Sequence, residues 1–126
     1  MFKQIKLQGN QISFFRKNQT YRLVFQNLNA LEFPALGMEL SVHDMLRIIS
    51  ELKRLSRKDL NLRSIDWELN GYRYSLNPTW PSEKSEKVWI SLTSVDQNYF
   101  EQDYIVAITF DELKEFINFL QDVNEL

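Results

Sequence analysis

Residues 37 to 46 read G-M-E-L-S-V-H-D-M-L, and residues 106 to 115 read V-A-I-T-F-D-E-L-K-E. Each stretch passes from an apolar run to a hydroxyl residue, Ser41 or Thr109, with an acid three positions later, Asp44 or Glu112. This spacing is typical of a capping box, in which the hydroxyl and the acid accept each other's backbone N–H groups at the start of a helix. Each stretch therefore predicts the point where a strand ends and a helix begins.

Apolar residues recur at helical spacing after both caps, so each cap is expected to open an amphipathic helix. The first helix is expected to end near Arg57, because Lys53, Arg54, Arg57 and Lys58 cluster there and cations favour a helix C-terminus. The two apolar stripes consist of Val42, Met45, Ile48, Ile49 and Leu52, and of Leu113, Phe116, Ile117, Leu120 and Val123.

Alternation of apolar and polar residues predicts four strands before each helix. The first four are expected at 2–7, 11–17, 21–26 and about 31–40, with Pro34 restricting part of the fourth to an edge or a bulge. The second four are expected at 64–70, 72–77, 88–95 and 104–109, separated by loops at 78–87 and 96–103. The sequence thus predicts an α+β fold, ββββα-ββββα, with two antiparallel sheets and two helices packed between or across them.

The two halves also match residue by residue at an offset of 68, where Leu40, Ser41 and Met45 face Ile108, Thr109 and Leu113. We interpret the chain as one domain, 1–126, with pseudo-repeats at about 1–59 and 63–126. Duplication of a ββββα unit is one explanation of the match. The other is that any two strand-to-helix junctions with capping boxes look alike.

The composition suits a folded domain and restricts its chemistry. The chain has 15 basic and 17 acidic residues and no cysteine, so a basic surface can arise only where charges are segregated, and thiolate chemistry is excluded. No signal peptide or membrane-spanning run is apparent, so a soluble cytoplasmic protein without a membrane partner is expected.

Enzymatic motifs are missing from the sequence. His43 is the single histidine, and no glycine-rich phosphate loop, G-x-S-x-G or H-E-x-x-H motif occurs. We therefore expect a protein that is not an enzyme, with no catalytic residues, no metal and no cofactor.

The stretch G-M-E-L-S-V-H-D-M, preceded by the hairpin-like I-S-F-F-R-K-N-Q-T-Y-R-L-V-F, resembles the positive cofactor four family of transcriptional coactivators. Gly37, Leu40 and Ser41 occupy the positions of that family's Gly-Ile-x-Leu-Ser/Thr strand, with Met38 in place of the isoleucine. The doubled order of elements is similar to the Whirly proteins and the kinetoplastid mitochondrial guide-RNA-binding proteins, although the lysine-rich motif of plant Whirly proteins is not found. The resemblance implies single-stranded DNA or RNA binding in transcription, replication or RNA handling, and further assembly into homo-oligomers.

Binding a single strand requires cations that follow the phosphates and flat side chains on which bases stack. The candidate phosphate contacts are Lys3, Arg16, Lys17, Arg22, Arg73, Lys84 and Lys87, and the candidate stacking residues are Tyr72, Trp80 and Trp89. Phe14, Tyr21 and Tyr74 lie near these cations, but strand aromatics are more often part of the core. The cations near Arg57, together with Arg63, are either a second basic patch or simply complement the helix dipole.

A rival hypothesis comes from a different class of protein. An acidic protein-interaction or adaptor subunit could use the same scaffold, with exposed aromatic residues as its contacts, since aromatic residues are enriched at interface hot spots. The residues concerned are Trp80, Trp89, Tyr99 and Phe100.

Overall fold

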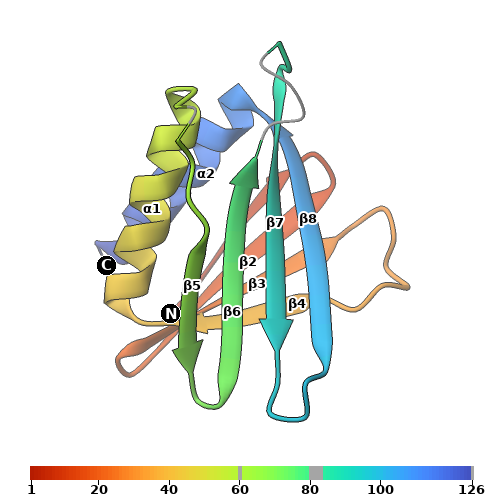
Figure 1. The fold of residues 1–126 in the computed structure, drawn as a ribbon, viewed down its shortest axis with the longest axis vertical. Helices are drawn as coiled ribbons and strands as arrows, with labels where there is room; N and C mark the ends of the chain where they lie inside the picture. Colours follow the sequence, from red (N-terminus) through yellow and green to blue (C-terminus); the bar gives the residue numbers. More distant parts are fainter. Residues whose placement is uncertain (60, 80–83, 126) are drawn as a thin grey trace.

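The computed structural model describes residues 1–59, 61–79 and 84–125. Its order of elements is the predicted ββββα-ββββα (Figure 1). The first half contains β1 (Phe2–Leu7), β2 (Asn10–Lys17), β3 (Thr20–Asn27), β4 (Leu36–Leu40) and α1 (Val42–Ser56). The second half contains β5 (Ile65–Leu69), β6 (Tyr72–Thr79), β7 (Lys87–Val95), β8 (Glu101–Thr109) and α2 (Phe110–Asn124).

Each half forms its own antiparallel four-stranded sheet, with the strands in sequence order. We call the sheet of β1 to β4 sheet A and the sheet of β5 to β8 sheet B. In Figure 1 sheet B lies in front of sheet A, and α1 and α2 lie beside each other along one side of the sheets. Each helix contacts strands of both sheets, which confirms that the helices pack across them.

The core lies between the two sheets and the helices. Because side chains alternate between the two faces of a strand, one face of each sheet points into the core. Phe25 of β3 is buried where the two halves of the chain meet. Its ring lies 6.4 Å from the ring of Phe116 on α2 and 5.9 Å from that of Tyr104 on β8. The first half therefore buries Phe25, one of its largest side chains, against the second half.

Side-chain hydrogen bonds between strands also join the sheets. Trp67 Nε1 donates to the backbone carbonyl oxygen of Glu39 at 2.8 Å, and the Tyr104 hydroxyl donates to Asn10 Oδ1 at 2.6 Å. Burial raises the pKa of Tyr104 to about 12. Both bonds satisfy polar atoms that would otherwise be costly to remove from water.

Both predicted capping boxes are confirmed. Ser41 Oγ accepts the Asp44 backbone N–H at 3.1 Å, and Thr109 Oγ1 accepts the Glu112 backbone N–H at 3.2 Å, while each acid accepts the N–H of its cap residue. Gly71 separates β5 from β6 as expected, but the turn also takes in Asn70, and both residues have positive φ, as a two-residue hairpin of type I′ requires.

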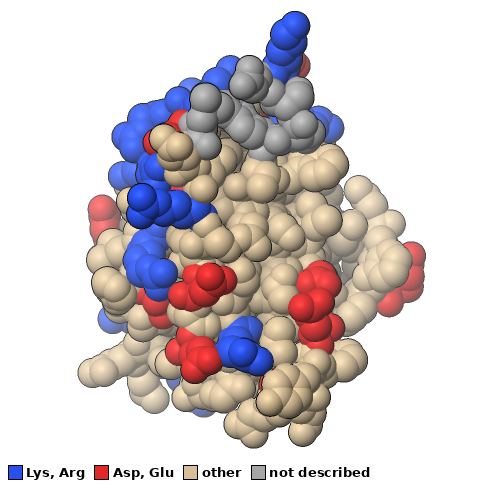
Figure 2. Space-filling model, in the orientation of Figure 1, with Lys and Arg blue, Asp and Glu red and all other residues tan. Residues whose placement is uncertain are grey.

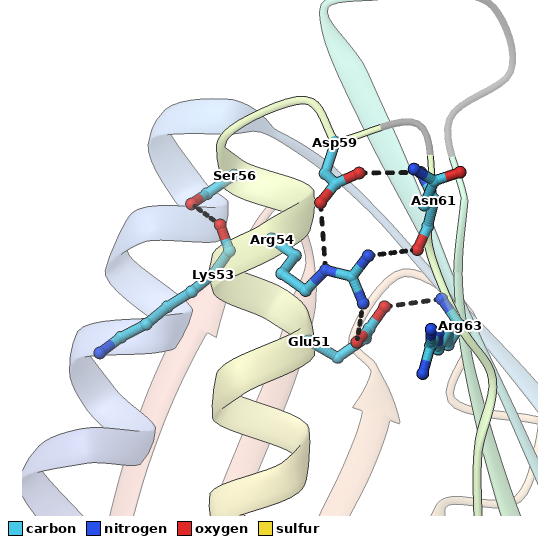
Figure 3. Close-up of polar contacts among 7 residues, drawn as sticks. All are labelled: Glu51, Lys53, Arg54, Ser56, Asp59, Asn61 and Arg63. Atoms are coloured by element: carbon cyan, nitrogen blue, oxygen red, sulfur yellow. Dashed lines mark hydrogen bonds and ion pairs between the residues drawn. The ribbon is translucent and has the colours of Figure 1, made fainter.

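The C-terminal end of α1 is tied to the segment that leads into β5 (Figure 3). Arg54 contacts Asp59 Oδ2 at 3.1 Å, Glu51 Oε2 at 3.3 Å and the carbonyl oxygen of Asn61. The hydrogen bond to Asp59 raises the pKa of Arg54, and the Asn61 backbone N–H together with Arg54 lowers the pKa of Asp59. The side chain of Arg54 therefore stabilises the fold here, and the Arg63 backbone N–H adds a hydrogen bond of 2.6 Å to Glu51 Oε1.

Three predicted strand boundaries differ from the structure by two residues or more. The fourth strand begins at Leu36, because residues 31–35, including Pro34, form an exposed loop. β6 continues through Pro78, which is buried and pairs with Ile90, and β8 begins at Glu101 inside the predicted loop. In the last two cases the neighbouring strand extends the pairing beyond the apolar residues that local alternation detects. Among the described residues, no helix is long and apolar enough to span a membrane.

Candidate functional site

Charge is segregated between the two sheets, although the whole chain is slightly acidic. The strands of sheet A carry five Lys or Arg residues and one Glu, a formal charge of 5 − 1 = +4. The strands of sheet B carry two basic and four acidic residues, a formal charge of 2 − 4 = −2. Sheet A is thus the more suitable of the two for an anionic ligand.

Four side chains form a straight row across the outer face of sheet A, the face turned away from the core. Strand pairing places Phe2 opposite Phe15, Phe15 opposite Arg22, and Arg22 opposite Glu39. Neighbouring strands are about 4.8 Å apart, so three steps span about 14 Å. We call these four residues the outer row.

The first two members of the outer row are an exposed aromatic pair. Phe2 and Phe15 are 51% and 40% exposed, and their ring centroids lie 5.0 Å apart at an interplanar angle of 46°. Alternation along β2 explains the exposure, since Phe14 faces the core and its neighbour must face outward. Exposed rings beside cations provide a surface on which another planar ring can stack.

The other two members form an ion pair, with Arg22 Nη1 3.5 Å from Glu39 Oε1. The Arg22 guanidinium lies against Gly37, where an added Cβ would collide with it. Glu39 Oε2 also accepts a hydrogen bond of 2.8 Å from Asn70 Nδ2, in the β5–β6 turn. The Glu39 carboxylate therefore contacts Arg22 of sheet A and Asn70 of the turn in sheet B.

The outer row lines one hollow of about 530 Å³. The Arg16 guanidinium lies 5.8 Å from the centroid of the Tyr21 ring, also in the wall, and Lys17 is exposed at the end of β2. The hollow therefore combines two exposed phenylalanines, three cations and one carboxylate. Its remaining lining residues are Met1 and Thr20.

The structure places the four sequence-predicted residues of the first half at or near this hollow. Arg16, Lys17 and Arg22 line it. Lys3 is exposed on β1, but it pairs with Phe14 and so belongs to the opposite side of the sheet from Phe2. Phe14, like Tyr21 and Tyr74, is buried, as the core interpretation of these aromatics predicted.

The predicted residues of the second half are not brought together. Trp89 is 45% exposed on the outer face of sheet B, two positions from the exposed Lys87, and Lys84 is exposed just before the strand. Arg73 lies toward the other end of the sheet, because it pairs with Val95 whereas Trp89 pairs with Thr79. Its guanidinium lies 6.0 Å from the centroid of the Tyr99 ring.

The two remaining aromatic candidates are Tyr72 and Trp80. Tyr72 stacks on the buried Tyr74, with ring centroids 5.9 Å apart, and so does not share the outer face with Trp89. Trp80 lies outside the described residues.

Figure 2 shows the distribution of charge on the side of sheet B. The middle of this face is largely uncharged, acidic side chains gather over its lower half, and basic side chains gather over α1 and at the upper end. The second basic patch of the sequence includes Lys58, just after α1, whose Nζ lies 5.0 Å from the Phe110 ring centroid, and Arg54 of α1, which is held by the contacts described above. This second basic patch is thus partly structural.

Sequence reasoning missed Phe2, Phe15, Lys6 and Glu39 as candidates. The buried positions Ile12 and Phe14 already imply that Phe15 faces outward, so alternation alone could have identified it. Glu39 had no comparable signal, because its proximity to Phe2 depends on the pairing of four strands.

Comparison with solved structures identifies the fold. One similar structure is a guide-RNA-binding protein complex bound to a gRNA, with a TM-score of 0.55 and 11% sequence identity, and the match covers 90% of this chain and 77% of that chain. A second is MRP1/MRP2 of Trypanosoma brucei, with a TM-score of 0.52, 10% identity and coverage of 99% of this chain and 84% of that chain. A third is WHY1 of Arabidopsis thaliana, with a TM-score of 0.54, 14% identity and coverage of 98% of this chain and 88% of that chain. No family model and no curated protein matches the sequence. The structural likeness confirms the predicted Whirly-like α+β fold.

Proposed function

We propose that this chain is a single-stranded nucleic-acid-binding protein, not an enzyme, and that the strand binds on the outer face of sheet A. The observation that carries the proposal is the concentration of positive charge in sheet A beside the exposed pair Phe2 and Phe15. Sequence-tolerant binding of single strands uses this combination, because cations neutralise phosphates while aromatic rings stack on bases.

The similar structures support the proposal at the level of the fold. One of them is a guide-RNA-binding protein complex bound to a gRNA, at 11% identity to this chain. Proteins with one fold often differ in function, so the argument for this chain rests on its own side chains.

The hollow suggests how a strand would lie. Bases would stack on Phe2 and Phe15, and the phosphates would pass Arg16 and Lys17 at the ends of the strands. Lys6 on β1, which lies on the same side of the strand as Phe2, would extend the cationic path along the edge of the sheet.

Fluorescence anisotropy with labelled single-stranded DNA and RNA, at about 50 and about 200 mM salt, tests the proposal. We expect Phe15→Ser to weaken binding roughly 5- to 150-fold, the range that corresponds to one lost stacking contact. The matched variant Trp89→Ser on sheet B is expected to have a smaller effect. A larger effect of Trp89→Ser would move the site to sheet B, and no binding at the lower salt concentration would overturn the proposed function.

The salt dependence provides an independent test of the phosphate contacts. Lys17→Gln is expected to reduce the slope of log K against log salt by about 0.7, the value for one phosphate contact on a single strand. Lys114→Gln, on the exposed surface of α2, removes the same charge away from sheet A and serves as the control. Equal slopes for the two variants would contradict the proposed path.

Protein–protein interaction is the second candidate function, and one specific observation favours it. Phe33 and Phe100 are exposed beside a hollow of about 470 Å³ at the open edge of β8, which also contains Glu101 and Asp103. Exposed aromatics at an unpaired strand edge are typical of contact surfaces. Sedimentation velocity over a range of concentrations tests self-association, which Phe100→Ser should reduce; a monomer at every concentration would exclude a homo-oligomer.

A further inference from the structure

We propose that the outer row forms a guanine subsite in which Glu39 recognises the base. The inference rests on the proposed function and adds to it a base preference and the residue responsible. The carboxylate of Glu39 lies on a surface proposed to bind phosphates, where a negative charge is unexpected.

Glu39 is the only acidic residue that lines the hollow among the described residues. A carboxylate there repels phosphates, so it opposes the attraction that Arg16 and Lys17 provide. It would favour binding only by meeting a ligand group that donates hydrogen bonds. In single-stranded DNA, the bases supply such donors, and neither the phosphates nor the deoxyriboses of the backbone do.

The contacts of Glu39 within the protein leave acceptor capacity unused. A carboxylate has about four lone-pair sites. Arg22 occupies one site of Oε1 at 3.5 Å, and Asn70 occupies one site of Oε2 at 2.8 Å. The side chain is 32% exposed and lines the hollow, so a ligand can reach it. Arg22 and Asn70 also fix its position, which reduces the entropy lost on binding.

The order of the outer row matches the shape of a stacked base. Phe15 on β2 and Glu39 on β4 are two strand spacings, about 10 Å, apart, so a base that rests on Phe15 and reaches across β3 toward the Arg22 guanidinium, which lies against Gly37, has its far edge close to Glu39. Gly37 allows this arrangement, because the absence of a side chain lets Arg22 lie close to β4. The guanidinium is itself a flat surface on which a base can stack.

Guanine is the base whose edge suits a carboxylate. Its N1–H and N2 amino group are adjacent donors with no acceptor between them, so they can donate to the two carboxylate oxygens together. Adenine and cytosine present one amino group beside an acceptor nitrogen. Thymine and uracil present one N–H between two carbonyl oxygens, which the carboxylate would repel.

The test uses oligothymidine of about 12 nucleotides with one central base changed to guanine, inosine or adenine, because inosine lacks only the N2 amino group. We expect the wild-type chain to bind the guanine oligonucleotide roughly 5- to 150-fold more tightly than the inosine one, the range for a good bidentate contact. This comparison needs no variant and so does not depend on the folding of one.

Two variants then assign the preference to Glu39. Glu39→Gln should bind guanine and inosine oligonucleotides equally and should bind plain oligothymidine more tightly, because a negative charge is removed. Glu101→Gln makes the same change on sheet B and should keep the preference. Equal wild-type affinity for guanine and inosine would overturn the subsite but leave the proposed function standing. A preference that survives in Glu39→Gln would overturn the role of Glu39, and no binding of any oligonucleotide would overturn both proposals.

Discussion

Gly37 shows how a single missing side chain shapes the candidate site. Its φ is not in the left-handed region, so glycine is needed there only for the space that Arg22 occupies. Arg22 has a flexible side chain and can move away from a methyl group at little cost.

We therefore expect Gly37→Ala to change the free energy of unfolding in urea by less than about 1 kcal/mol, since alanine also favours a strand slightly over glycine. Nucleic-acid affinity should fall, because Arg22 would be displaced from its position against residue 37 and beside Glu39. A large loss of stability with unchanged affinity would contradict this account of the residue.

Tyr104 makes stability dependent on alkaline pH. Burial raises its pKa from the ordinary value of 10.0 to about 12, so the folded state retains this proton where the unfolded state has lost it. The contribution to stability is complete below about pH 10 and is lost as the pH rises through about 12.

Urea unfolding at several pH values should show this decline, and Tyr104→Phe should reduce it while also removing the bond to Asn10. The exposed Tyr99 provides the control, because Tyr99→Phe should leave the decline unchanged. An identical decline in all three proteins would assign the effect to other groups.

The helices depend on their capping boxes, which are the same in both halves. Ser41→Ala and Thr109→Ala each remove an acceptor for a backbone N–H at a helix start, so each should lower the free energy of unfolding by about 1 kcal/mol. Ser50→Ala, in the exposed middle of α1, is the matched control and should change it by less than about 0.5 kcal/mol. Chemical denaturation measures all three, and an equal cost at Ser50 would show that capping is not the cause.

The whole molecule is expected to fold as one unit, because its halves share a core. Phe25 packs against Phe116 and Tyr104, and Trp67 donates to Glu39 across the sheets. A fragment of residues 1–59 would expose this surface to water, so we expect it to show no cooperative thermal unfolding by circular dichroism while the full chain does. A cooperative transition in the fragment would instead make each half a separate domain.

The strand order, the two helices and their first residues were predictable because they depend on local chemistry. Alternation identifies a strand, an apolar stripe identifies a helix, and the boxes at Ser41 and Thr109 mark where one becomes the other. Strand ends were less predictable. Pro78 lies within β6 because β7 pairs beside it, and a local pattern does not contain that information.

The sequence by itself determined the ββββα-ββββα order and the residue types available for a site. Only the tertiary structure decided which of them meet. Arg22 and Arg73 looked equivalent as strand cations, yet one lies in a row with two phenylalanines and a carboxylate, and the other lies beside Tyr99. The physical reason is that the outer row takes one residue from each of four strands, and strand register, set by burial of the opposite face, aligns them.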